Sequence, residues 1–349
     1  MWEAVYFDHD LARLTDLADR AAKLGVERYV LDDGWFRYRR NDLAGLGDWH
    51  VDETVWPNGL HPLVDHVRSL GMEFGLWFEP EMINLDSDLA REHPEWVMAT
   101  GGRTPVPSRN QQVLNLGIPE AYDHILERMS AILAEYDIAY IKWDHNRDLI
   151  DAGTAPHGRA GVHDQTLATY RLMDELKRRF PGLEIESCSS GGARVDLGIL
   201  ERTDRVWVSD CIDPLERQQM NRWTMQLLPP ELLGSHIASG ISHTTAGTTA
   251  CRSGRGRRCT GTSGSSGISR PPRTTRTHSS PCGSTCTSGT GNSCTRERWC
   301  GPTRSTRPCS STVRSRRTGR RRCSSSRTWG APRCHRGAGS RCPGSTPTG

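Results

Sequence analysis

The residues best suited to chemistry in this sequence lie between positions 139 and 147, where an apolar run turns polar at Lys142, Asp144 and Asn146. Such a run predicts a buried strand whose last residues emerge into a site. Because a nearby cation keeps a carboxylate ionised, Lys142 would hold Asp144 charged at neutral pH. An ionised, positioned carboxylate is what a covalent nucleophile at a sugar carbon has to be. Taken alone, the stretch also fits a strand end with solvated charges.

Glycoside hydrolysis needs a second carboxyl group, which protonates the leaving oxygen. Asp210 is the first acid after the apolar run 206–208, as Asp144 is after its own run. Other residues at expected strand ends could bind a sugar: Asp32 and Asp33 as acceptors, Trp35 and Trp77 as flat apolar faces, Arg109 and Lys142 as donors. Each has a plainer interpretation, since a double Asp can be a turn or a helix cap and a rim tryptophan can belong to the core.

Seven strands are expected to position these residues. Apolar runs predict strands at 3–7, 28–31, 74–78, just before Asp144, 183–186, 206–208 and 232–237, with helical periodicity between most of them. This alternation predicts an α/β fold, a (β/α)₈ TIM barrel that is incomplete at about seven units. In that fold chemistry collects at the C-terminal ends of the strands. A doubly wound sheet is the alternative, but no Gly-rich phosphate loop follows the first expected strand.

Composition divides the chain into two chemically different parts. Residues 1–245 carry 24 Lys and Arg against 40 Asp and Glu, a net charge of −16, and contain two of the 12 cysteines. Residues 246–349 carry 21 Arg, no Lys and one acid, a net charge of +20, with the other ten cysteines. The first part, residues 1–245, is expected to be a globular catalytic barrel. Its acidic composition and few cysteines are typical of a cytoplasmic protein. Neither a signal peptide nor an apolar run long enough to span a membrane is visible.

The second part, 246–349, has almost nothing to bury, and this predicts a disordered tail. An Arg-rich tail can also be a nucleic-acid arm, but such arms usually mix Lys with Arg. Zinc binding is disfavoured because the tail has no paired C-x-x-C and only His278 and His335. Because the tail contains no Lys, no nucleic-acid partner is expected.

The tail is also interpretable as a GC-rich gene translated out of frame. In another frame each residue takes the third base of one codon and the first two of the next. The codons of residues 252–269 then permit F-R-A-G-T-A-L-Y-R-H-L-G-I-E-W-D-L, among other strings. That string has the apolar pattern of a helix followed by a strand, which the visible tail lacks. A frameshift near residue 245 is the favoured explanation.

Seven motifs, in order along residues 2–245, resemble glycoside hydrolase family 36, the bacterial α-galactosidases. They are Leu31-Asp32-Asp33-Gly34-Trp35-Phe36, Gly47-Asp48-Trp49, Trp77-Phe78-Glu79-Pro80-Glu81, Arg109-Asn110-Gln111, Lys142-Trp143-Asp144, Cys188-Ser189-Ser190-Gly191-Gly192 and Ser209-Asp210. Together these motifs are highly specific. The out-of-frame string G-I-E-W-D resembles what the family carries around its eighth strand.

The resemblance implies retaining hydrolysis of terminal α-galactosides, with Asp144 as nucleophile and Asp210 as general acid/base. Asp213 is the weaker candidate for the acid, because it lies three residues further into its loop. The galactose would be surrounded by Asp32, Asp33, Trp77, Arg109, Lys142, Asn146, Cys188 and Gly191. Neither a metal nor an organic cofactor is implied. The expected partners are α-galactoside oligosaccharides, and no association with a membrane is expected. The resemblance also implies a homo-oligomer for the intact protein.

The sequence departs from the family at both ends. Members carry a β-sandwich domain before the barrel, an eighth barrel unit and a C-terminal β domain, so this chain is expected to be an impaired fragment. A related α-glycoside activity, such as α-N-acetylgalactosaminidase or galactosyl transfer, would use the same carboxylates. The other alternative is a non-catalytic carbohydrate-binding remnant, in which galactose binding would survive Asp144→Asn without turnover.

Overall fold

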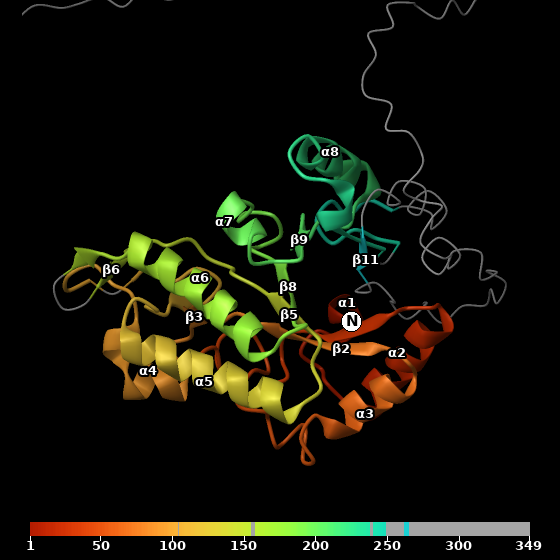
Figure 1. Ribbon diagram of the computed structural model, residues 1–349, viewed down its shortest axis with the longest axis horizontal. Helices are drawn as coiled ribbons and strands as arrows, with labels where there is room; N and C mark the ends of the chain where they lie inside the picture. Colours follow the sequence, from red (N-terminus) through yellow and green to blue (C-terminus); the bar gives the residue numbers. More distant parts are fainter. Residues whose placement is uncertain (104, 155–157, 238–239, 249–261, 265–349) are drawn as a thin grey trace, which may run out of the picture. The chain divides into compact units, whose positions relative to one another are not determined.

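The computed structural model describes residues 1–103, 105–154, 158–237, 240–248 and 262–264. Its main sheet is parallel and curled, and its strands are ordered in space as they are along the chain (Figure 1). From edge to edge they are β1 (Arg28–Leu31), β2 (Glu73–Phe78), β5 (Tyr140–Trp143), β8 (Glu184–Ser187), β9 (Arg205–Trp207), β10 (Leu233–His236) and β11 (Thr262–Gly264). Helices between the strands make the architecture that of an incomplete (β/α) barrel.

The helices are those expected of strand–helix units. The longer ones are α2 (Leu11–Lys23), α3 (His61–Ser69), α5 (Pro119–Glu135), α6 (Val162–Arg179) and α8 (Pro214–Thr224). The shorter ones are α1 (Trp2–Val5), α4 (Asp88–Glu92) and α7 (Leu197–Leu200), with 3₁₀ turns η1 (Pro94–Trp96) and η2 (Pro230–Leu232). In α2 the Asp10 side chain caps the first turn by accepting from the Arg13 amide at 2.9 Å. Its buried face is the apolar stripe that its helical periodicity predicts: Leu14, Leu17, Ala18 and Ala21.

The strand predicted at residues 3–7 is wrong, because the chain forms the helical turn α1 there. The Tyr6 amide donates to the Trp2 carbonyl at 2.8 Å, and the two rings meet edge to face at 5.1 Å. Side chains four residues apart are neighbours on a helix but not on a strand. Within the described part of the chain no strand lies beside this segment, so a strand here would leave its backbone groups unpaired. The first sheet strand is therefore β1.

The other six expected strands are confirmed with shifts of one or two residues at their ends. A seventh, β11, lies in the segment predicted to be a disordered tail and pairs in parallel with β10. The remaining residues of the predicted tail, 249–261 and 265–349, lie outside the described residues, as does any boundary within them. All described residues belong to one compact unit, Met1–Arg296.

Two small antiparallel ladders shape the loops beyond the strand ends. One joins β3 (Met82–Ile83), just after β2, to β4 (Gln112–Val113). The other joins β6 (Gly153–Thr154) to β7 (Arg159–Ala160) in the connection before α6. The first ladder has consequences for the site, because it brings the turn that contains Arg109 back to the end of β2.

Candidate active site

The hydrogen-bond register brings the ends of three central strands level with one another. Trp77 of β2 pairs with Lys142 of β5, which pairs in turn with Glu186 of β8. One residue further along, all three strands end. Directly after these strand ends come Glu79, Asp144 and Cys188. Parallel strands of a barrel present their C-terminal ends on one side, where its chemistry is found.

Asp144 is a buried carboxylate that is held in its ionised form. Its Oδ2 accepts a hydrogen bond from the Trp77 indole at 3.1 Å, and its Oδ1 accepts from the His145 amide at 2.9 Å. Burial raises the pKa of Asp144, but the Lys142 ammonium and hydrogen bonds from Asn146 and Cys188 outweigh it and leave the pKa below its usual value. A carboxylate that stays charged while buried is poised to act as a nucleophile.

Lys142 and Asp32 form an ion pair beside Asp144. The Lys142 Nζ lies 2.9 Å from Asp32 Oδ2, with side chains 15% and 9% exposed. Burial lowers the pKa of Lys142, but Asp32, Cys188, Asp144 and Asp210 raise it well above its usual value. The ammonium also lies 5.6 Å from the centre of the Trp207 ring. The Lys142 ammonium therefore interacts electrostatically with both Asp144 and Asp210.

Asp33 is bound inside the protein by Arg39. The guanidinium grips the carboxylate in a fork, with Nε to Oδ1 at 3.0 Å and NH2 to Oδ2 at 2.9 Å. Arg39 also donates to Asn84 Oδ1 at 3.3 Å. Burial still leaves the pKa of Asp33 raised, with Asp32 and Asp144 adding to the shift and Arg39 opposing it. Asp33 thus borders the candidate site and is also part of the internal framework.

The two tryptophans expected to offer flat faces to a sugar lie in an aromatic core. Trp35 is fully buried and Trp77 is 2% exposed. The Trp35 indole donates to the Trp77 carbonyl at 2.9 Å, while the Trp77 ring stacks on Phe36 at 6.3 Å. Trp35 therefore belongs to the core rather than to a binding face. Trp77 reaches the site through its indole N–H, which binds Asp144.

Asp210 lies at the end of β9, on an exposed turn. Its Oδ1 accepts from the Trp207 indole at 2.8 Å, so that ring lies between Lys142 and Asp210. Asp213 is 8% exposed and caps α8, since its Oδ1 accepts from the Leu215 amide at 2.8 Å. A capping carboxylate is engaged by backbone amides, and Asp210 is therefore the freer of the two acids.

Cys188 and Gly191 bring the loop after β8 against these carboxylates. Cys188 is buried, and burial followed by the charge of Asp144 raises its thiol pKa well above the usual value. It is therefore a neutral donor to Asp144 rather than a nucleophile. Gly191 has φ +90°, and a Cβ on it would lie 2.7 Å from the Ser209 Cα and 3.2 Å from the Asp210 amide nitrogen. Only glycine lets this loop contact the Asp210 turn so closely.

We expect Gly191→Ala to disturb Asp210, whereas Gly182→Ala should not. Gly182 has a similar φ of +99° but nothing within 4 Å of its Cβ position. Both variants should lose roughly 1–2 kcal/mol of unfolding free energy through left-handed strain. Gly191→Ala should lose more in urea unfolding, because its Cβ must also displace the backbone at Ser209 and Asp210. Equal losses of stability would contradict this role for Gly191.

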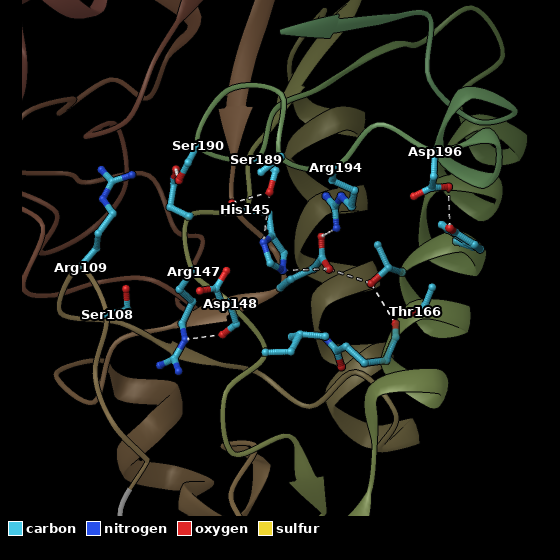
Figure 2. A pocket seen from close by; sticks show the side chains of 17 residues that line it. Ser108, Arg109, His145, Arg147, Asp148, Thr166, Ser189, Ser190, Arg194 and Asp196 are labelled. Carbon is cyan, nitrogen blue, oxygen red and sulfur yellow. Dashed lines mark hydrogen bonds and ion pairs between the residues drawn. The ribbon is translucent and has the colours of Figure 1, made fainter. Parts of the chain in front are cut away.

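Arg109 and Asn146 line a cavity of about 580 Å³ together with Glu81 and His145. Figure 2 shows the side chains around it, which come from the turn at Ser108, the loop after β5, α6 and the loop after β8. Asn146 is buried and its Oδ1 accepts from Ser190 Oγ at 3.1 Å, while Arg109 is exposed. The structure therefore places both of these predicted residues on the wall of the same cavity. Asp144 is not among the residues that line it.

Several residues next to the site were not predicted as members of it. Glu79 follows β2 and is 1% exposed, Arg39 holds Asp33, and Trp207 holds Asp210. Glu81 is 2% exposed and binds Arg194 at 2.7 Å, and the charge of Arg194 helps lower its pKa to about 2 against the effect of burial. The sequence contained a signal for the two glutamates. Glu79 directly follows β2, a strand as apolar as the one before Asp144, and Glu81 comes two residues later.

Within the described residues no group of three or more His, Cys, Asp and Glu side chains is placed to hold a metal ion. The same part of the chain contains no helix with the length and apolar character needed to cross a membrane.

The curled parallel sheet, with carboxylates following the ends of several strands, has the architecture of an incomplete (β/α) barrel whose polar residues collect at the C-terminal ends of its strands. The family model described as Melibiase matches residues 1–269. The chain is 51% identical over 244 residues to an alpha-galactosidase of Escherichia coli, and 44% identical over 241 residues to alpha-galactosidase Mel36A of Lactobacillus acidophilus. This chain belongs to the melibiase family.

Solved structures agree with this assignment. The crystal structure of GH36 alpha-galactosidase AgaA from Geobacillus stearothermophilus superposes with a TM-score of 0.73 at 38% identity, covering 75% of this chain and 37% of that one. The matched part is 70% of this chain but 34% of the Escherichia coli relative and 33% of the Lactobacillus one. The chain therefore spans about a third of the length of the curated relatives it matches.

Proposed function

We propose that this chain carries the sugar-cleaving site of an α-galactosidase. The observation that carries the proposal is the environment of Asp144, a buried carboxylate kept ionised beside the Lys142–Asp32 pair. The names of the relatives support the substrate class, since the Escherichia coli and Lactobacillus proteins are both alpha-galactosidases. Crystal structures of AgaA variants from Geobacillus stearothermophilus are complexes with raffinose and with stachyose. We therefore propose α-galactoside oligosaccharides as substrates.

The proposed mechanism is a retaining one with two displacements. Asp144 attacks the anomeric carbon, forming a C–O bond to the sugar while the bond to the leaving oxygen breaks, and Asp210 gives that oxygen its proton. Asp210 then takes a proton from water, whose oxygen attacks the same carbon and releases Asp144. Lys142 balances the charge of the free carboxylates throughout. The galactose would be held by Asp32, Asp33, Trp77, Arg109, Lys142, Asn146, Cys188 and Gly191.

The test is turnover of p-nitrophenyl α-galactoside by the purified chain, with the released sugar followed by proton NMR. Retention predicts that α-galactose appears first and mutarotates later. We expect slow turnover, because β1 and β11 are the edges of the described sheet. Replacing Asp210 with Asn should abolish it, whereas Asp213→Asn keeps a capping oxygen and should not. A chain that neither binds galactose nor releases nitrophenol would contradict the proposal, and initial β-galactose would contradict the retaining mechanism.

We also propose that the reading frame shifts near codon 245. In support, β11 occupies residues 262–264, where the alternative reading has L-G-I of its L-G-I-E-W-D-L segment. An apolar strand at that place fits the next barrel strand after β10. Resequencing codons 240–260 should then reveal one missing or extra base, and an intact frame would overturn the proposal. Residues 1–245 are the proposed catalytic domain, and 246–349, apart from β11, the proposed disordered tail.

The proposed location is the cytoplasm, and the proposed assembly of the intact protein is a homo-oligomer. The two cysteines within 1–245, Cys188 and Cys211, are both free and buried, as suits a reducing compartment. Fractionation of the producing cells and light scattering of the purified protein test these two points separately.

A further inference from the structure

Glu79 is a buried carboxyl group that joins three segments at the edge of the site. It directly follows β2 and is 1% exposed. Its Oε1 accepts from the Gln111 side-chain amide at 2.7 Å and from the Asn146 backbone amide at 2.5 Å. One oxygen therefore ties the end of β2 to the turn before β4 and to the loop after β5.

The turn bound through Gln111 is strained at its centre. Ser108 and Gln111 close it with two backbone hydrogen bonds of 3.3 and 3.1 Å. Between them Arg109 has φ +49° and Asn110 has φ +60°. Two consecutive left-handed residues make a type I′ geometry, which Asn tolerates and Arg does not favour. Such strain persists only where the surrounding structure holds it in place.

Three hydrogen bonds from other segments of the chain hold this turn in place. Glu79 binds the Gln111 side chain, while Arg147 NH1 donates to the Gln111 carbonyl at 2.7 Å. The Asn84 amide donates to the Asn110 carbonyl at 2.8 Å. The exposed Arg109 is thus presented by a turn whose next two residues, Asn110 and Gln111, are anchored by buried side chains.

We propose that Glu79 is a positioning residue: it holds Asn146 and the strained turn that presents Arg109 in the places where they contact the sugar. This role rests on the proposed function, since it supposes that Arg109 and Asn146 contact the galactose. Glu79 itself is buried behind them and touches no substrate.

The charge state of Glu79 suits this role. Burial, and next the charge of Asp144, raise its pKa to about 8, against the hydrogen bonds from Asn146 and Gln111 and the charge of Arg39. At neutral pH it is therefore uncharged, and its carbonyl oxygen accepts both hydrogen bonds. Its Oε2 is buried, with no hydrogen-bond partner in the described part of the chain. Above pH 8 a second negative charge would arise beside Asp144 in a place that cannot solvate it.

Galactose affinity of the purified full chain, measured by calorimetry, provides the test. Arg109→Ala should weaken binding about tenfold or more, as expected for losing a charged hydrogen bond. Glu79→Ala should cause a similar loss. Because Glu79 acts partly through Arg109 and partly through Asn146, the two losses should overlap, and the double variant should bind more weakly than Arg109→Ala alone but less than about a hundredfold more weakly than wild type. Glu73→Gln, at the exposed far end of β2, is the matched control.

Glu79→Gln separates positioning from a general structural role, because its amide oxygen can still accept both hydrogen bonds but cannot ionise. It should restore most of the affinity that Glu79→Ala loses. Wild-type affinity should fall above pH 8, and that of Glu79→Gln should not. Multiplicative losses in the double variant together with the same pH dependence in Glu79→Gln would overturn the proposal. Wild-type chain that fails to bind galactose at all would instead overturn the proposed function.

Discussion

Replacing Asp144 with Ala is expected to lower kcat/KM for an aryl α-galactoside by a factor of about 10³ or more, the range found when an enzyme loses its nucleophile. Three other buried carboxylates near the strand ends are already engaged by partners. Glu81 is bound by Arg194, Asp33 is bound by Arg39, and Asp213 caps α8. Asp137→Asn is the matched control, because Asp137 lies before β5 at the opposite end and its side chain is 62% exposed. A variant without Asp144 that retained a tenth of the rate would show that another group attacks the sugar.

The surroundings of Asp144 predict the pH dependence of the same reaction. Since Lys142 helps to hold the pKa of Asp144 below its usual value, the acid limb of kcat/KM should lie below about pH 4. The depressed pKa also means that Asp144 favours the folded state at neutral pH, and this contribution is lost as the pH falls through the folded-state pKa. Lys142→Met should move the acid limb upwards. An unmoved limb would mean that Lys142 does not set the charge of Asp144.

The position of Asp144 could be predicted from sequence because the signal is local. An apolar strand followed by polar residues marks a rim position in any parallel barrel, and β2, β5, β8, β9 and β10 all carried that pattern. The segment at residues 3–7 carried it too, yet formed α1. Whether a short apolar run becomes a strand depends on whether another strand lies beside it in the fold. The five residues of the run do not contain that information.

The roles of the aromatic residues and of Glu79 could not be predicted, because they depend on contacts between distant segments. Trp77 is a largely apolar side chain, but its indole N–H donates a hydrogen bond to the Asp144 carboxylate, 67 positions away. Glu79 contacts Gln111, 32 positions away and next to the β3–β4 ladder, and Asn146, 67 positions away. The burial of Arg39 could not be predicted either, because a lone arginine in a loop is usually solvated. Its burial follows from the Asp33 carboxylate, and that dependence can be measured.

Arg39→Met is expected to lower the free energy of unfolding by about 3–5 kcal/mol at pH 7, because it leaves the buried Asp33 carboxylate without its partner. Arg39 and Asp33 have side chains only 2% and 9% exposed, and they are 2.9 Å apart. Methionine keeps much of the volume of the arginine stem, so the loss reports mainly on charge. Urea unfolding of the purified chain measures it. A loss below 1 kcal/mol would show that Asp33 is not held by this pair.

The double variant Arg39→Met with Asp33→Asn tests whether the loss comes from the unpaired charge. With no carboxylate left to bury, much of the stability should return, as happens when both members of a buried ion pair become uncharged. The single variant also has a predicted pH dependence. Without Arg39 the folded-state pKa of Asp33 rises further above its unfolded value of about 3.9, so the penalty is small near pH 4 and grows as the pH rises towards the folded-state pKa. A penalty that did not change with pH, or a double variant no more stable than Arg39→Met alone, would assign the loss to packing around Phe7 and Phe36, whose rings the guanidinium faces at 5.5 and 5.8 Å.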